Sequence, residues 1–154
     1  SWYALQAAAK DGLFTEKTAK AIEKLELLTL IEVDKFLHGP FNKDCLLGKI
    51  AVETASDQDI DIIFQILDAI VERSARYSAA ILTACAIQTG EGKNFAKPIC
   101  ILCDGTTFFK TYKIKERVNA YLDEVLTKQL EINWNIVSCD NDITLGTAIA
   151  GLID

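Results

Sequence analysis

The stretch ICILCDGTTFFKTY, residues 99–112, decides which fold class the sequence predicts. Its first five residues are all apolar, which is typical of a buried strand, and its last seven are rich in threonine and aromatic residues, which favour strands. The Asp104–Gly105 pair between them predicts a tight turn, because glycine and, less readily, aspartate accept a positive φ. The stretch therefore predicts two strands, 99–103 and 106–112, joined at this pair.

The residues on either side of this stretch predict helices and one further strand. Downstream, apolar residues recur at helical spacing over 114–130, alternate as a strand over 132–136, and end in a small-residue helix over 144–153. Upstream, the longest helix is expected over 57–86, where Ser56 and Asp59 have the spacing of a capping box. Shorter helices are expected before Asp11–Gly12, from Thr15 to about Thr29, and over 32–37.

These elements predict the α/β class in one domain over 1–154. Residues 1–93 form a helical half, and residues 94–154 form a β-β-α-β-α half. A chain of 154 residues is long enough to bury a sizeable core without disulfides or a metal.

Charge and cysteine content limit the partners and the compartment. A net charge of -6 disfavours binding to nucleic acid or to an anionic membrane surface, and no apolar run approaches the ~20 residues that a membrane-spanning helix needs. Five cysteines are an odd number without a dense disulfide framework, which indicates a reducing compartment. We therefore predict a cytoplasmic protein with neither a nucleic-acid nor a membrane partner.

The sequence offers no candidate for a catalytic residue and none for a metal ligand set. Cys100 and Cys103 have the spacing of a CxxC pair, but residues three apart on a strand point to opposite faces. Neither of the common glycine-rich phosphate motifs, GxxxxGK[ST] and GxGxxG, occurs.

Two loops qualify as a ligand site, because open α/β sheets bind ligands beyond the carboxyl ends of their strands. One is Asp104–Thr106 and the other is 140–144, and both open on one edge of the sheet if the strands before them are parallel neighbours. Backbone amides, threonine hydroxyls and the glycines Gly105 and Gly146 suit a phosphate or a ribose. The alternatives are an ordinary hairpin turn at Gly105 and a helix-packing role for Gly146.

Positive charge collects just after the first of these loops. Lys110, Lys113, Lys115 and Arg117 lie within eight residues, interrupted by one acidic residue, Glu116. This segment is either a local anion site or a solvated helix face.

Three motifs together resemble one known family. In chain order they are ERSARYSAAILTACA (72–86), PICILCDGTTFFK (98–110) and INWNIVSCDNDITLGTAIAGLI (132–153). Their order and spacing resemble the carboxyl-terminal part of the hexokinase family, and the resemblance extends over roughly residues 12–153.

The resemblance implies an actin-like, ribonuclease-H-related ATPase fold. In that fold ATP lies between two lobes, and a hexose is phosphorylated at its 6-hydroxyl with Mg²⁺. The family's DGT turn lies at the phosphates of ATP, which implies nucleotide contacts at Asp104, Gly105 and Thr106. The family's final loop and glycine lie near the adenosine, which implies contacts from Asp142 to Gly146.

The chain also departs from the family pattern. It lacks the family's amino-terminal phosphate loop, the family's catalytic aspartate and the residues with which the family binds the sugar. We therefore expect it to be the carboxyl-terminal portion of the large lobe, to need the amino-terminal part of the same kinase as a partner, and to be inactive alone.

Three alternatives stay open at this level. One is another actin-like kinase that acts on a different sugar or a small acid. The second is a degenerate, non-catalytic module that senses nucleotide or sugar or dimerises, which the acidic closing loop CDNDITLG (139–146) slightly favours. The third is a structural domain whose Ala/Ser-rich helix packs against a partner.

Overall fold

The structure, a computed structural model, describes residues 1–138 and combines helices with one small sheet. The chain divides into two compact units, 1–73 and 74–154, and the boundary falls inside the long helix α5 (Asp57–Thr89). A single domain over 1–154 stays a prediction, as do Asp142 and Gly146, which lie outside the described residues. Within residues 1–138, none of the helices is both long and apolar enough to cross a bilayer.

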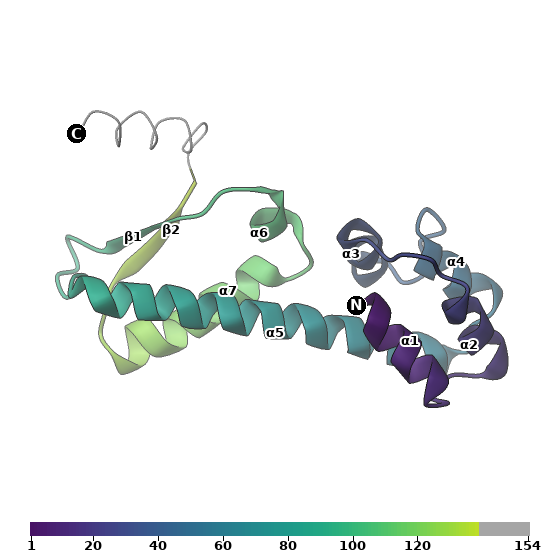
Figure 1. Ribbon diagram of the computed structural model, residues 1–154. Helices are drawn as coiled ribbons and strands as arrows, with labels where there is room; N and C mark the ends of the chain where they lie inside the picture. Colours follow the sequence, from purple (N-terminus) through teal and green to yellow (C-terminus); the bar gives the residue numbers. More distant parts are fainter. Residues whose placement is uncertain (139–154) are drawn as a thin grey trace, which may run out of the picture. The chain divides into compact units, whose positions relative to one another are not determined.

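The first unit is entirely helical, as its periodic apolar residues predicted (Figure 1). It consists of α1 (Trp2–Lys10), α2 (Glu16–Glu23), α3 (Leu30–His38), α4 (Leu46–Glu53) and the start of α5. The predicted helices before Asp11, over 32–37 and from 57 onward are confirmed. The helix expected from Thr15 to Thr29 is too long, because α2 ends at Glu23.

Side chains of α1 explain the early end of α2. Trp2 Nε1 donates a hydrogen bond to the carbonyl of Leu25 (2.8 Å), and Gln6 Nε2 donates to the carbonyl of Ile22 (2.6 Å). These donors satisfy carbonyl groups where the helical bonding ends. The helix therefore ends where a distant segment supplies partners, which the local sequence of α2 does not reveal.

Helix α4 was not predicted, because its N-terminus lacks an oxygen-bearing cap. Cys45 takes the N-cap position, where its Sγ accepts from the amide of Gly48 (3.3 Å). Gly48 is required by packing, since a Cβ at this position would lie 1.9 Å from the carbonyl oxygen of Asn42.

Asp59 joins the N-termini of two helices of the first unit. Its side chain is 2% exposed and accepts hydrogen bonds from the amides of Thr15 (2.9 Å) and Ser56 (3.0 Å) and the hydroxyls of Thr15 (2.7 Å) and Thr18 (2.9 Å). Ser56 Oγ accepts from the Asp59 amide (3.2 Å), which confirms the predicted capping box. Burial alone would raise the pKa of Asp59, but the bonds from Thr15, Ser56 and Thr18 hold it well below its usual range.

The second unit contains the sheet. After the end of α5, its residues up to 138 form β1 (Ile99–Leu102), α6 (Thr106–Lys110), α7 (Ile114–Leu122), the π-helical turn η1 (Asp123–Gln129) and β2 (Trp134–Val137). β1 and β2 pair in parallel, with Ile99 opposite Trp134 and Leu102 opposite Val137. The predicted strands at 99–103 and 132–136 and the helix over 114–130 are therefore confirmed in type and approximate extent.

The predicted strand over 106–112 is wrong, because residues 106–110 form helix α6. The Asp104–Gly105 pair makes no hairpin turn, since Gly105 has φ 91° and ψ 153°, a combination that none of the hairpin turn types uses. β1 instead pairs with β2, which is distant in sequence, and Phe108 packs against the core of the unit. Tertiary packing thus overrides the strand preference of this Thr/Phe-rich run.

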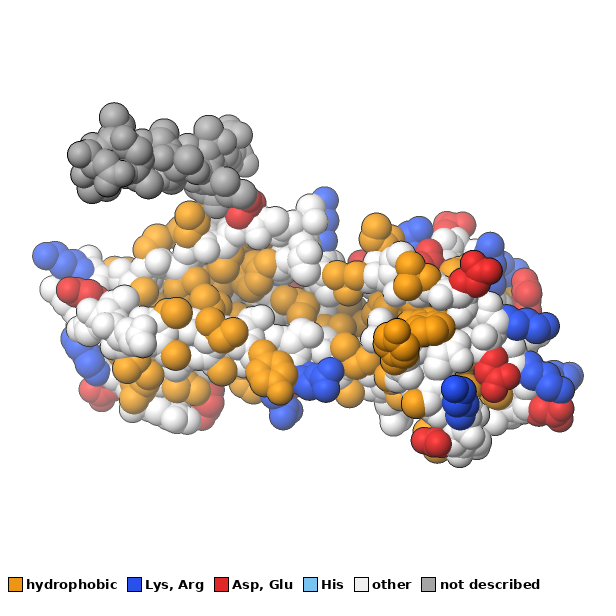
Figure 2. Space-filling model, in the orientation of Figure 1, with side chains coloured by type: hydrophobic (Ala, Val, Ile, Leu, Met, Phe, Trp, Pro, Cys, Tyr) orange, Lys and Arg blue, Asp and Glu red, His pale blue; other side chains and the backbone are white. Residues whose placement is uncertain are grey.

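The core of the second unit lies between the second half of α5, the sheet and α7–η1. Its buried members all have apolar side chains: Ala75, Ala79, Ala86, Ile101, Val118, Leu122, Leu126 and Ile132. Large hydrophobic side chains also reach the surface of this unit (Figure 2), among them Tyr77 and Ile81 of α5, which are 66% and 64% exposed. The Ala/Ser-rich part of α5 therefore presents one apolar face to the core and another to the outside.

Candidate functional site

The turn Asp104–Thr106 lies directly beyond the carboxyl end of β1. The amide of Cys103 still donates to the carbonyl of Val137 (2.9 Å), so the pairing of β1 with β2 continues to the start of the turn. Because the two strands are parallel, the chain leaves both of them at the same edge of the sheet. The condition on which the predicted site depends, a parallel pair of neighbouring strands, is therefore met.

Gly105 has a backbone conformation that essentially only glycine adopts. Its φ of 91° with ψ of 153° lies outside the regions open to residues with a Cβ. Apart from Gly105 itself and its two chain neighbours, no heavy atom of the described residues lies within 4 Å of the position a Cβ would take, so the requirement comes from the backbone and not from crowding. Open space above a glycine backbone permits close approach of a ligand.

The polar groups of the turn are arranged around this glycine. The amide of Gly105 donates to Asp104 Oδ1 (2.6 Å), and Thr106 begins α6, whose first turn no side chain of residues 1–138 caps. Backbone amides in the first turn of a helix lack intrahelical acceptors. The turn and the start of α6 thus combine one carboxylate, two threonine hydroxyls (Thr106 and Thr107) and backbone amides without intrahelical acceptors, which suit an oxyanion accompanied by a cation.

A hollow of about 380 Å³ lies beside the turn. Its walls come from α5 (Ser78, Ile81, Leu82), the end of β1 (Leu102, Cys103, Asp104) and α6 (Phe108). The lining is mostly apolar, with Asp104 and Ser78 as its polar members, and burial raises the pKa of the Cys103 thiol. A ligand held at the turn would find apolar surface next to it.

The α5 wall of this hollow was missed at the sequence level. The sequence suggests a packing role for the Ala/Ser-rich run of α5, but nothing in its spacing relates Ser78 or Leu82 to a turn about 25 residues later. Only the packing of α5 against β1 brings them together.

Two lysines of the basic segment, residues 110–117, lie close to aromatic rings. Lys113 Nζ lies 5.0 Å from the ring centroid of Tyr112, and Lys115 Nζ lies 5.1 Å from that of Phe109. Cation–π contacts of this kind occur at exposed sites and contribute modestly. The two interpretations of the segment, an anion site and a solvated face, both stay open.

The described residues do not form a metal-binding site from protein ligands alone. Across 1–138, no group of three or more histidine, cysteine or acidic side chains is placed to hold a metal ion. Mg²⁺ commonly needs only one or two carboxylates when phosphates supply its other ligands, and the turn contains one carboxylate, that of Asp104.

Comparison with family models places the chain in a known family. The family model described as Hexokinase matches residues 4–153, nearly the whole chain. The comparisons with curated proteins and with solved structures gave no match. With the DGT turn at the end of a strand in a parallel pair and a match that spans both units, the chain belongs to the hexokinase family.

Proposed function

We propose that this chain forms the nucleotide side of the ATP site of a hexokinase-like sugar kinase. The intact kinase would transfer the γ-phosphoryl group of Mg-ATP to the 6-hydroxyl of glucose or a related hexose. The observation that carries the proposal is Gly105, whose glycine-only conformation opens the backbone at the carboxyl end of β1 in a chain of this family.

Each residue of the turn has a distinct role in this proposal. Gly105 lets a phosphate approach the backbone, and the hydroxyl and amide of Thr106 donate hydrogen bonds to it. The carboxylate of Asp104 would repel a bare phosphate, so it faces the Mg²⁺ that accompanies ATP. Binding should therefore be stronger for Mg-ATP than for ATP without metal.

The second loop completes the proposed site. Asp142 and Gly146 would lie near the adenosine, as the resemblance to the family implies. The amino-terminal part of the same kinase would supply the catalytic base and the sugar contacts, since no residue of this chain is assigned to either role. A cytoplasmic location also remains a proposal, based on the cysteine content.

An amide NMR titration with Mg-ATP tests the proposal directly. Saturable shifts at Gly105 and Thr106 at millimolar nucleotide are expected, and ATP in the presence of a chelator should give weaker shifts. Asp104→Asn keeps an oxygen that can accept from the Gly105 amide but removes the charge, so it should abolish the advantage of Mg-ATP over metal-free ATP. A folded sample without shifts at the turn would reject the nucleotide site.

A further inference from the structure

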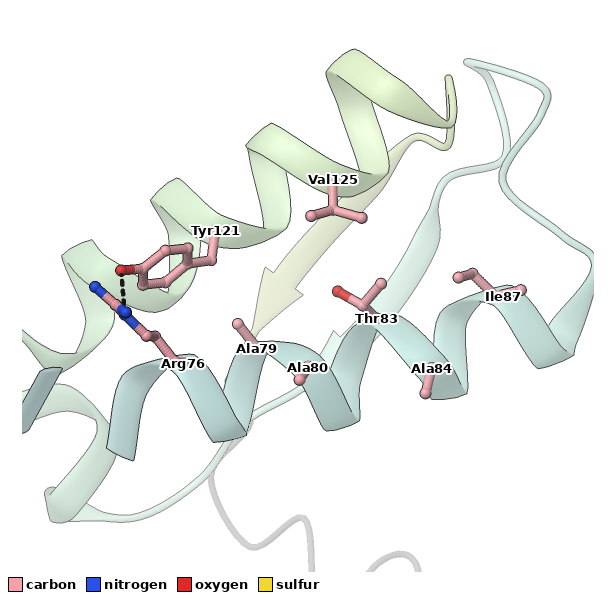
Figure 3. Close-up of a pocket in the computed structure, with 8 residues that line it drawn as sticks. All are labelled: Arg76, Ala79, Ala80, Thr83, Ala84, Ile87, Tyr121 and Val125. Atoms are coloured by element: carbon pink, nitrogen blue, oxygen red, sulfur yellow. Dashed lines mark hydrogen bonds between the residues drawn. The ribbon is translucent and has the colours of Figure 1, made fainter. Parts of the chain in front are cut away.

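One face of the two-stranded sheet packs on the core of the second unit. Ile101 and Ile136 are register partners, so their side chains point to the same face, and both belong to this core. On that side α5 and the helix formed by α7 and η1 run next to each other, with Ala79 and Tyr121 lining the space between them (Figure 3). The helix that connects β1 to β2 therefore occupies the core face of the sheet.

The opposite face of the sheet, called the open face below, is exposed. It consists of Cys100 and Leu102 of β1 and their register partners Asn135 and Val137 of β2. All four residues are exposed, Leu102 by 54% and Val137 by 37%. Parallel sheets are normally covered on both faces. Residues 1–138 thus supply a cover for only one face of a sheet that needs two.

Residues 144–153, TLGTAIAGLI, have the composition of a covering helix. None of the ten residues is charged, which is typical of a helix that is buried and not of one that faces water. In a helix, four of the apolar residues fall on one side because they recur at spacings of three, four and seven: Leu145, Ala148, Ile149 and Leu152. Ten helical residues are about 15 Å long, close to the roughly 13 Å of a four-residue strand.

The end of β2 brings these residues to the open face. β2 ends at Val137, at the edge of the sheet where β1 leads into the turn Asp104–Thr106. The six residues 138–143 span up to about 20 Å when extended, which exceeds the diameter of a helix, about 10–12 Å. The chain can therefore turn back over the open face without a long loop.

We propose that residues 144–153 form a helix that docks on the open face through its leucine and isoleucine side. The sheet then lies between two helical layers, as parallel sheets normally do. The docked helix would also hold Asp142 near the turn Asp104–Thr106. Only this last consequence rests on the proposed function, because the docking itself needs no nucleotide.

The thiol of Cys100 reports on the cover of the open face, and Cys85, an exposed cysteine of α5, is the internal control. The chain is alkylated with N-ethylmaleimide in the absence of nucleotide, and mass spectrometry gives the rate at each cysteine relative to the urea-unfolded chain. A docked helix should make Cys100 react about tenfold or more slowly than Cys85. Ile149→Asp places a charge in the contact and should remove this protection. Thr147→Asp, a matched change on the opposite side of the same helix, should leave it intact.

Nuclear Overhauser effects between methyl groups test the contact in the unsubstituted chain, independently of how the variants fold. Effects that join Leu102 or Val137 to Ile149 or Leu152 are expected at all protein concentrations. The proposal is overturned if these effects are absent, if the two cysteines react equally fast, or if both variants lose protection equally. Effects found only between differently labelled copies would assign the open face to a second copy and would also overturn it.

Discussion

Asp59 connects two helix starts through one carboxylate with four hydrogen-bond donors. A neutral carboxylic acid cannot accept from the same donors equally well, because its protonated oxygen becomes a donor. The ionised form is therefore tied to the folded state of the first unit, which is the physical reason for the lowered pKa of Asp59. In the unfolded chain the same side chain would titrate near the ordinary value of about 3.9.

This linkage predicts a pH dependence of stability. Since the folded-state pKa of Asp59 is lowered, its contribution is fully present above about pH 5 and is lost as the pH falls through and below about 4. Asp59→Asn should lower the free energy of unfolding by about 2–4 kcal/mol at neutral pH. Its stability should also depend less on pH between about 5 and 2 than that of the unsubstituted chain. Urea denaturation at a series of pH values, followed by circular dichroism, measures both effects.

Asp57→Asn is the matched control, because Asp57 is an exposed aspartate in the same first turn of α5. Its effect should stay within about 1 kcal/mol, the range of helix-dipole effects at exposed sites. Equal pH profiles for the two variants would mean that Asp59 does not carry the linkage.

Gly105 is the residue on which the proposed nucleotide site depends. Gly105→Ala forces a Cβ into a glycine-only conformation, which costs about 1–3 kcal/mol or makes the turn rearrange. The shifts that Mg-ATP causes at Thr106 should therefore be lost or weakened at least tenfold. Gly12→Ala is the matched control, because Gly12 also has a positive φ (73°) and open space around it but lies in the first unit. Unchanged nucleotide binding by Gly105→Ala would contradict the assigned role of the turn.

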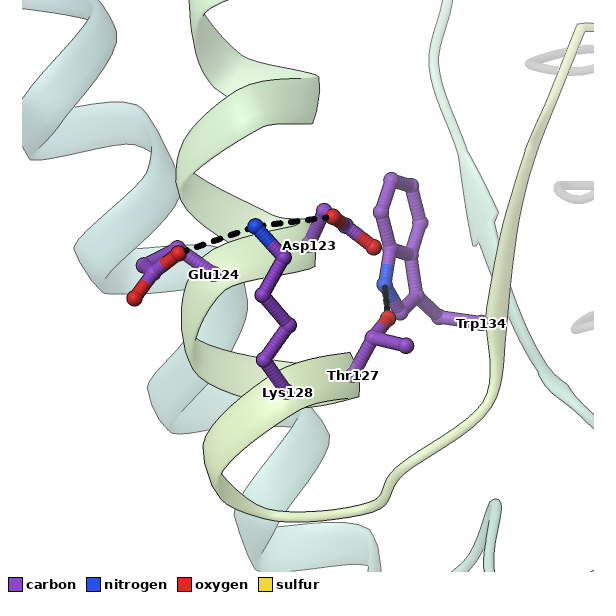
Figure 4. Close-up of polar contacts among 5 residues, drawn as sticks. All are labelled: Asp123, Glu124, Thr127, Lys128 and Trp134. Atoms are coloured by element: carbon purple, nitrogen blue, oxygen red, sulfur yellow. Dashed lines mark hydrogen bonds and ion pairs between the residues drawn. The ribbon is translucent and has the colours of Figure 1, made fainter.

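At the scale of elements, the helix formed by α7 and η1 has one apolar and one polar side. Leu122 and Leu126 are fully buried in the core of the second unit. On the polar side (Figure 4), Lys128 Nζ lies 3.1 Å from Glu124 Oε2 and 3.7 Å from Asp123 Oδ2. The hydrogen bond and charge of Glu124, with a smaller part from Asp123, raise the pKa of Lys128. These groups are exposed, so water screens the pairs.

The two sides of this helix should contribute very differently to stability. Leu126→Ala leaves a cavity in the core and should lower the free energy of unfolding by about 2–5 kcal/mol. Lys128→Ala, two residues along the same π-helical turn, should change the urea midpoint only slightly. Comparable losses in both variants would show that the ion pairs, and not the buried leucine, hold this helix in place.

A side-chain bond also connects this helix to the sheet. Trp134 Nε1 donates to Thr127 Oγ1 (3.1 Å), which joins the end of η1 to the first residue of β2 (Figure 4). The bond fixes the orientation of an indole that is only partly buried. β2 is therefore anchored on one side by β1 and at its start by η1.

At the scale of the whole molecule, the family match extends across both compact units. In the proposed function the chain binds and positions the nucleotide, and the catalytic base comes from the amino-terminal part of the kinase. Positioning without a base does not complete phosphoryl transfer to a sugar hydroxyl at an enzymatic rate.

This division of roles predicts binding without turnover. The chain alone should bind Mg-ATP at millimolar concentration and form no glucose 6-phosphate above background, in a coupled assay with glucose and Mg-ATP. Addition of an amino-terminal hexokinase segment that carries the catalytic aspartate should restore activity, and Asp104→Ala should reduce that activity. Product formation by the chain alone, in proportion to its concentration and lost in Asp104→Ala, would show that the base lies within these residues.

The sequence by itself determined the features that depend on near neighbours. Helical periodicity placed α1, α3, α5 and α7, and the pair Ser56 and Asp59 marked the start of α5, because helix bonds and caps join residues three to four apart. The order of three motifs also indicated the hexokinase family, which the family match confirms. Of the proposed site residues, Asp104, Gly105 and Thr106 do lie together at the end of a strand.

Only the tertiary structure decided the features that depend on distant partners. Residues 106–110 are helical although their composition favours a strand, because β1 pairs with β2 and not with the residues that follow it. α2 ends at Glu23 because Trp2 and Gln6 supply donors from another helix. The hollow beside Asp104 arises from the packing of α5 against β1 and α6. Local patterns specify a helix through bonds within it, whereas strand pairing, the early end of α2 and the hollow depend on contacts that no local pattern contains.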